Sequence, residues 1–231
     1  MKYRVKFTKN GPIKYIGHLD VMRYFQKAIR RAQIPIAYSE GFSPHQILSF
    51  AFPLSVGFTS EGEYFDMELT EEVNEDDLLK TFNSVLNEGI TVSAVRKLPK
   101  EAGNCMACVF AASYKVSIKD STLFDEKNIK LALDYFSQQT IPVNKPKKKG
   151  GGFIDIDLKD FLYDFSIKDN CVYFTVNASS SGNIKPDFVM DCFYNAIGIE
   201  KPDFSYHIHR IDIMGNVGDE EHIKLVSLLD L

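Results

Sequence analysis

The residues with the greatest potential for chemistry lie in two short segments near the N-terminus. His18 and Asp20 stand at the start of a predicted helix, and His45 ends the loop 41–45, which reads Gly-Phe-Ser-Pro-His. Two imidazoles can act as general acid and base, and a nearby carboxylate can orient a ring or a ligand. His18, Asp20 and His45 are therefore candidate catalytic residues, and capping or loop roles are the structural alternative.

Four cations follow along the same predicted helix. At about 100° of rotation per residue they share one face, which consists of Arg23, Lys27, Arg30 and Arg31. Asp20 is the only acid in this helix, whereas an ordinary exposed helix usually places acids one turn away from its cations. The pattern favours a surface for RNA phosphates or an acidic partner, with a solvated helix face as the alternative.

Further polar and aromatic groups suit a nucleic acid. Phe42 can stack on a base or fill the core, and Ser43 and His45 can donate hydrogen bonds. A second basic segment carries Lys147, Lys148 and Lys149, which precede three glycines. Such a segment is costly to order, so it is either a mobile loop or an arm that orders on RNA. These six residues join the helix cations in a candidate RNA- or anion-binding set.

The cysteines do not form a recognisable metal motif. Cys105 and Cys108 make a single Cys-x-x-Cys pair, and Cys171 and Cys192 are distant and unpaired in sequence. A zinc site would need two more ligands with suitable spacing. The cysteine spacing of a radical SAM cluster and the motifs of nucleotide-binding glycine loops are also missing. We therefore predict no metal and no cofactor.

Composition and length favour an ordinary globular protein. The chain has 231 residues, of which 45% are hydrophobic and 25% charged, with a net charge of −4. No apolar run reaches the roughly 18 residues of a membrane span, and the N-terminus lacks the apolar stretch of a signal peptide. We expect a cytoplasmic protein with no membrane partner, whose cysteines are free thiols.

Charge is distributed unevenly along the chain. Residues 1–50 have a net charge of +7, and residues 51–104 have a net charge of −7. Such asymmetry can place one positive face on an acidic protein. Alternatively, the two segments pair with each other.

The first half of the chain shows the periodicity of strands and helices in alternation. The predicted elements are strand 2–8, helix 18–33, strand 34–38, extended segment 46–58, strand 63–69, helix 74–86 capped by Asn74, and strand 90–98. In the first helix, Leu19 is expected to face the core with Phe25 and Ile29. The order β-α-β-β-α-β is the split ferredoxin-like plan.

The second half repeats a similar order. The predicted elements are strand 109–118, helix 124–138, strands 161–167 and 171–177, a helix from Pro186 to Ala196, strand 204–213, and a short helix 220–229. The prediction is an α+β protein of two tandem ferredoxin-like units with antiparallel sheets. We place the domains at residues 1–100 and 108–231.

Several segments together resemble a known bacterial family. They are 17–20 (Gly-His-Leu-Asp), 41–45, 48–51 (Leu-Ser-Phe-Ala), 53–57 (Pro-Leu-Ser-Val-Gly), 60–66 (Ser-Glu-Gly-Glu-Tyr-Phe-Asp) and 182–187 (Gly-Asn-Ile-Lys-Pro-Asp). The chain resembles, over essentially its whole length, the radical SAM-associated family of unknown function. Members occur as free proteins or fused behind a B12-binding-type radical SAM enzyme. The family usually has Ser at the position of Gly17 and Pro at that of Gln46.

The resemblance implies a radical SAM protein as partner and RNA modification as the setting. With the basic helix, it suggests an accessory protein without catalytic activity of its own that binds RNA, for example tRNA, or presents a substrate. One alternative is a metal-independent RNA-processing enzyme in which His18 and His45 are acid and base. A second alternative is a protein–protein adaptor.

Overall fold

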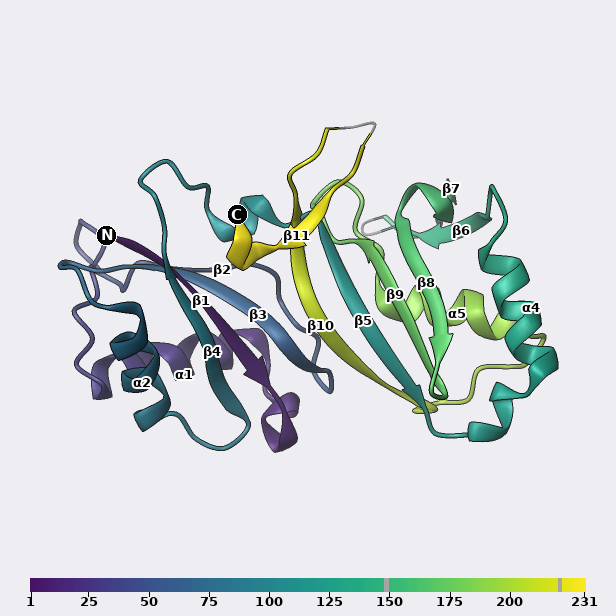
Figure 1. Cartoon of the computed structure of the whole chain (residues 1–231), viewed down its shortest axis with the longest axis horizontal. Coiled ribbons are helices and arrows are strands. Elements are labelled where there is room, and N and C mark those ends of the chain that lie inside the picture. The colour runs from purple at the N-terminus through teal and green to yellow at the C-terminus, as the bar shows by residue number, and fades with distance from the viewer. Residues whose placement is uncertain (148–149, 220–221) are drawn as a thin grey trace. The chain divides into compact units, whose positions relative to one another are not determined.

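The computed structural model describes residues 1–147, 150–219 and 222–231, and the chain has a mixed α+β fold with mostly antiparallel strands (Figure 1). It divides into two compact units, residues 1–110 with 209–231 and residues 111–208. The C-terminal segment, which we expected in the second domain, thus lies in the first unit. Among the described residues, no helix combines the length and apolar character that crossing a membrane requires.

The first unit is a sheet covered on one face by two helices. Its main elements are β1 (Lys2–Lys9), α1 (His18–Arg31), β2 (Leu48–Phe50), β3 (Thr59–Glu68), α2 (Glu75–Val85) and β4 (Ile90–Lys97). β1 pairs antiparallel with both β3 and β4, and β2 pairs antiparallel with one end of β3. The other end of β3 pairs in parallel with β10 (Tyr206–Asn216) through His209 and Arg210.

Alternation along β1 determines which side chains enter the core. Tyr3, Val5 and Phe7 are buried on the face that α1 and α2 cover. Phe25 of α1 lies at the centre of this core, with ring centroids 4.7 Å from Phe7 and 4.8 Å from Phe65. Such aromatic pairs stabilise a core beyond the area that they bury.

Local signals determine where the helices begin. The Asn74 side chain accepts hydrogen bonds from the backbone of Asp76 and Asp77, so the predicted cap of α2 is confirmed. α1 begins after Gly17, whose lack of a side chain leaves the helix without a side-chain cap. Segment 34–38, predicted as a strand, contributes only isolated bridges at Ile36 and Tyr38.

The C-terminal part of the first unit also corrects a prediction. The described residues of 220–229 contain no α-helix; they contain the strand β11 (Leu225–Ser227) and the start of a 3-10 turn at Leu228–Asp230. β11 pairs with Met214–Asn216 of β10, and this pairing satisfies backbone groups that a short isolated helix would leave exposed. A four-residue helix, α3 (Cys105–Cys108), belongs to the same unit.

The second unit contains three neighbouring antiparallel strands, a separate hairpin and two helices. Its elements are β5 (Ala111–Ile118), α4 (Glu126–Phe136), β6 (Pro142–Pro146), β7 (Phe153–Asp157), β8 (Leu162–Lys168), β9 (Cys171–Asn177) and α5 (Pro186–Ala196). β9 lies between β5 and β8, all antiparallel, and β6 and β7 form a separate hairpin. The rings of Phe136 and Phe165 stack with their centroids 3.8 Å apart, and this contact packs α4 against β8. Pro186 is the first residue of α5, as predicted.

Candidate functional site

The predicted cations of α1 all lie at the surface of the first unit. Arg23 Nη1 lies 3.4 Å from Asp20 Oδ1, one turn earlier, and Arg31 Nη2 donates to the Val85 carbonyl at 2.9 Å. Within the described residues, no ion pair involves Lys27 or Arg30. These two charges therefore keep their full attraction for an external anion.

Leu19 contradicts the prediction that it faces the core. Its side chain is 64% exposed, and the buried residues of α1 are Val21, Phe25, Ala28 and Ile29. Helical rotation places Leu19 beside the cations, so the surface of α1 is basic with one exposed apolar side chain.

The loop 39–45 is closed by its own hydrogen bonds. Ser39 N donates to the His45 carbonyl at 2.8 Å, and the Ser39 hydroxyl contacts both His45 Nδ1 at 2.8 Å and His45 N at 3.1 Å. Phe42 is fully exposed at the tip, which excludes the core as its location. Ser43 is exposed beside it. The loop thus holds an aromatic ring in solvent on a closed backbone.

The end of this loop is attached to α1. Gln46 is buried, and its Nε2 donates to the Gln26 carbonyl at 3.3 Å, in the middle of the helix. This contact joins the loop of Phe42 to the helix of the cations. The two predicted segments therefore belong to one surface, which we call the α1–loop surface: α1 residues 19–31 and loop residues 39–45.

His18 lies in a different environment from His45. Its half-buried ring contacts Phe50 edge-on at 5.6 Å and lines a small cavity with Lys9, Phe52 and Glu63. Burial, assisted by the Lys9 charge, lowers the pKa of His18. His45 does not line this cavity, and among the described residues no contact joins the two rings. The structure thus places the two imidazoles in separate surroundings.

Buried charges, which sequence reasoning missed, fix the segments around this cavity. Lys9 Nζ donates to the carbonyls of Lys14 and Ile16, at 3.3 and 2.9 Å, and so holds the chain that enters α1. Arg210 binds Glu63 through Nη1 and also donates to the Phe52 carbonyl. Burial raises the pKa of Glu63, an effect that Arg210 opposes, and lowers the pKa of Lys9.

The alternation of buried and exposed residues along a strand could have revealed two of these buried charges, Lys9 and Glu63. Lys9 continues the buried phase of Val5 and Phe7 along β1, and Glu63 is in phase with Phe65 on β3. A charge in phase with core residues predicts a buried ion that needs a partner.

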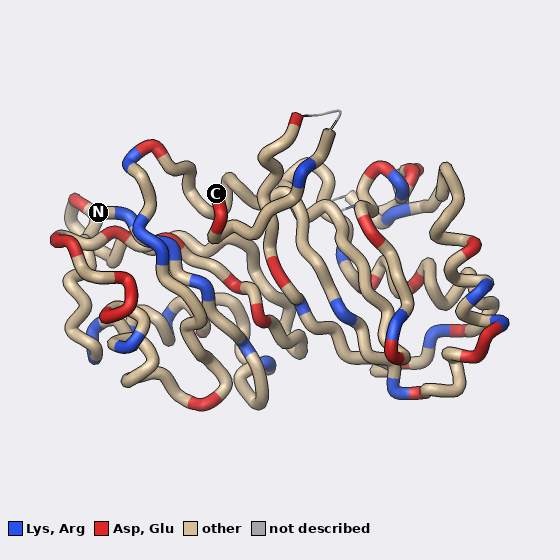
Figure 2. Tube along the Cα trace, in the orientation of Figure 1, with Lys and Arg blue, Asp and Glu red and all other residues tan. Residues whose placement is uncertain are grey.

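On the opposite face of the same sheet, cations of the first segment are paired with acids. β1 carries a run of basic residues (Figure 2), and Arg4 is bound to Asp66 of β3 at 2.8 Å through Nε. Lys2 also lies near Asp66, and Lys6 pairs with Asp212 of β10. The strand cations are thus partly neutralised inside the unit, whereas the α1 cations remain at the surface.

The Cys-x-x-Cys pair forms α3 and is attached to this ion pair. Cys105 N donates to Asp66 Oδ2 at 2.8 Å, and its thiol contacts the Ser49 carbonyl at 2.9 Å. Burial raises the pKa of the Cys105 thiol to about 12. A thiol with that pKa is protonated at neutral pH, which argues for a packing role.

Of the second basic segment, Lys147 directly follows strand β6. Lys147 is exposed, and its backbone N–H donates to the Gly152 carbonyl at 3.0 Å. Lys148 and Lys149 lie outside the described residues. Sequence reasoning treated this segment alone; the structure also places it beside α5, through a pocket that Lys145, Lys147 and Lys185 help to line.

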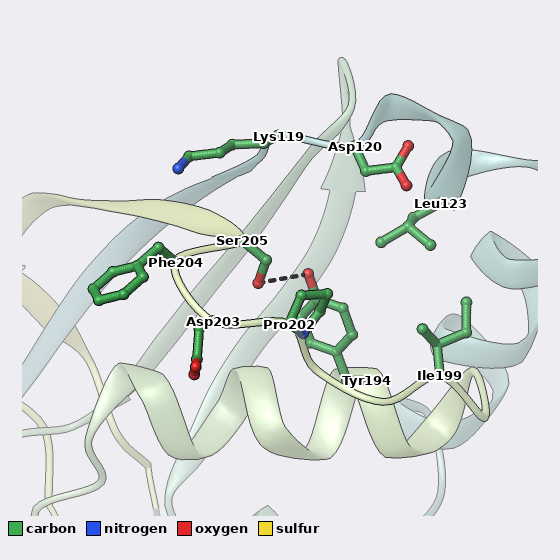
Figure 3. Close-up of a pocket in the computed structure, with 9 residues that line it drawn as sticks. All are labelled: Lys119, Asp120, Leu123, Tyr194, Ile199, Pro202, Asp203, Phe204 and Ser205. Atoms are coloured by element: carbon green, nitrogen blue, oxygen red, sulfur yellow. Dashed lines mark hydrogen bonds between the residues drawn. The ribbon is translucent and has the colours of Figure 1, made fainter.

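A second pocket of the same unit is shown in Figure 3 and has a volume of about 340 Å³. Its Tyr194 hydroxyl donates to Ser205 Oγ at 3.2 Å, and Asp120 caps the following turn through the Thr122 backbone. Phe204 is exposed and has a φ of 53°. Polar groups of this pocket are hydrogen-bonded to neighbouring residues, and fewer cations line it than line the pocket of Lys145, Lys147 and Lys185.

Together, the fold and these surfaces define a two-unit α+β protein with an exposed basic helix. The chain belongs to a family described as uncharacterized proteins conserved in bacteria (DUF2344), whose model matches residues 2–186. No curated protein matches the chain. Membership in a bacterial family of unknown function is thus confirmed, and the association with radical SAM enzymes stays a prediction.

Proposed function

We propose that this protein is an RNA-binding accessory module that holds RNA on the α1–loop surface and presents it to a radical SAM enzyme. The observation that carries the proposal is Phe42, which is fully exposed at the tip of a closed loop that is hydrogen-bonded to α1. A ring held in water at the tip of a closed loop is available for stacking on an unpaired base.

The two parts of the surface suit the two parts of a nucleotide. Lys27 and Arg30 are exposed cations without an ion pair among the described residues, and such charges attract phosphates. An exposed aromatic ring stacks on unpaired bases, at roughly 1–3 kcal/mol per base. A single-stranded RNA segment, such as a tRNA loop or end, supplies both groups at once.

The partner and the finer fold rest on other grounds. The radical SAM partner rests on the resemblance of the motif segments. A ferredoxin-like plan in the first unit is supported by β1 lying between β3 and β4, with β2 on β3 and two helices on one face. A cytoplasmic setting agrees with the four cysteines, which are free thiols.

The direct test is binding of fluorescently labelled tRNA and single-stranded RNA by fluorescence anisotropy at low salt. Phe42→Ala is expected to weaken binding by about 1–3 kcal/mol, the worth of one stacked base. Phe204→Ala removes another highly exposed ring, from the other unit, and serves as the matched control. Equal affinities of both variants and the wild type would refute the RNA role; capture of a radical SAM protein without RNA would then favour the adaptor.

A further inference from the structure

The pocket beside the β6–β7 hairpin has the dimensions of a small-molecule site. Its volume is about 360 Å³, within the range of ligand pockets in proteins. Two segments that are distant in sequence build it: the end of β6 and the turn that leads into α5. Lys145 Nζ joins them by donating to the Asn183 carbonyl at 2.5 Å.

The acids that line this pocket are bonded to other groups of the unit. Lys145, Lys147 and Lys185 line it, and in the described part of the chain Lys147 and Lys185 form no ion pair. Asp187 Oδ1 accepts from the Tyr206 hydroxyl at 2.9 Å, and Asp191 is paired with Lys201. Lysines around a concave surface favour a phosphate group, which they bind through charge-assisted hydrogen bonds.

The other lining groups suit a nucleoside. The ring of Phe188 lines the pocket and offers a surface for stacking a base. The carboxylates of Asp187 and Asp191 retain acceptor capacity beyond their present bonds, and ribose hydroxyls are donors of matching chemistry. Cations, an aromatic ring and acceptors thus line one cavity.

The turn on one side of the pocket is tightly packed. A Cβ at Gly182 would lie 2.9 Å from Asn177 Oδ1 and 2.9 Å from Phe161 Cε1, so any other residue there would force one of these side chains to shift. Asn177 Oδ1 also accepts from Ser179 N, and Ile184 N donates to the Asn177 carbonyl. These bonds hold Asn183 and Lys185 in place before a ligand arrives, which lowers the entropic cost of binding.

From this arrangement we infer that the pocket binds a nucleoside monophosphate, with its phosphate at Lys145, Lys147 and Lys185 and its base against Phe188. The same chemistry is presented by a free nucleotide and by the 5′-phosphorylated end of an RNA. This site is separate from the α1–loop surface and does not depend on it.

The first experiment is isothermal titration of the full chain with AMP, with adenosine and inorganic phosphate as partial ligands. AMP is expected to bind more tightly than either part. Lys185→Ala and Lys145→Ala are expected to weaken AMP binding roughly tenfold or more, the loss of one charge-assisted hydrogen bond. Lys130→Ala removes an exposed cation from α4 and is the matched control, with unchanged affinity.

The second experiment distinguishes a free nucleotide from a 5′-phosphorylated RNA end as the ligand. It also tests the pocket independently of RNA binding at the α1–loop surface. A hexanucleotide RNA with a 5′-phosphate and the same RNA with a 5′-hydroxyl compete against a fluorescent AMP analogue. Selective displacement by the phosphorylated RNA identifies an RNA end, whereas AMP binding without displacement identifies a free nucleotide. Lys27→Ala/Arg30→Ala should leave AMP affinity unchanged. The inference is overturned if neither AMP nor phosphorylated RNA binds, or if binding is insensitive to both Lys145→Ala and Lys185→Ala.

Discussion

Arg210 Nη1 donates to both carboxylate oxygens of Glu63, at 2.9 and 3.1 Å, although 147 positions separate the two residues in sequence. The pair is buried, and Arg210 also donates to the carbonyls of Phe52 and Pro53. One side chain thus ties strand β10 to β3 and to the segment of Phe52 and Pro53.

Removing one partner of this pair should be strongly destabilising. Arg210→Met leaves the Glu63 carboxylate buried without its cation, at a cost of about 3–5 kcal/mol in the free energy of unfolding. Replacing both partners, as in Arg210→Met/Glu63→Leu, should recover part of the loss because neither charge of the pair is then left buried without the other. Urea unfolding measures all three proteins; a double variant less stable than Arg210→Met would contradict this view of the pair.

A missing cap makes α1 a place where stability can be gained. Gly17 has φ −77° and ψ 168°, and the nearest atom to an added Cβ is Asp20 Oδ2 at 4.0 Å. Gly17→Ser therefore fits without strain and completes a Ser-x-x-Asp capping arrangement, with an expected gain of a few tenths to about 1 kcal/mol. Gly17→Ala lacks the acceptor, so thermal unfolding should show no comparable gain; equal stability of the two variants would rule out capping.

The buried thiol of Cys105 should make stability depend on alkaline pH. Burial raises its pKa from the ordinary 9.0 to about 12, so above about pH 9 the unfolded thiol ionises while the folded one keeps its proton. The folded state then holds more protons, and its stability falls as pH rises. The advantage of the wild type over Cys105→Ala should shrink by about 1.4 kcal/mol per pH unit above pH 9. Urea unfolding under reducing conditions tests this; a constant difference from pH 7 to about pH 10.5 would contradict it.

Local sequence determined much of the fold, and distant partners determined the rest. Asn74 and Pro186 mark helix starts by their own chemistry, so both were predicted correctly. Leu225–Ser227 was misread as part of a helix because its partner, Met214–Asn216, lies elsewhere in the chain. The prediction for Leu19 was wrong because, at about 100° per residue, Leu19 lies only about 40° from Arg23 on α1 and so shares the exposed face.

The candidate surfaces likewise include features that local sequence predicts and features that depend on distant partners. The cations of α1 could be found from helical spacing, since they lie on one short element. The partners of Lys9 and Arg210 could not be found in this way, because the fold of the chain, and not a regular spacing on one element, brings them together. The lysine pocket of the second unit likewise depends on the contact between Lys145 and Asn183, which no local sequence pattern predicts.

The central claim is that the α1–loop surface binds RNA phosphates, and the salt dependence of RNA affinity tests it most directly. Each phosphate contact contributes a slope of about −0.7 in log K against log salt for single strands, so Lys27→Ala/Arg30→Ala should make the slope shallower by about 1.4. Lys80→Ala/Lys100→Ala removes two exposed cations elsewhere in the same unit and should preserve the slope. A shallower slope for the α1 variant alone is the predicted result; equal slopes for wild type and both variants would contradict the account.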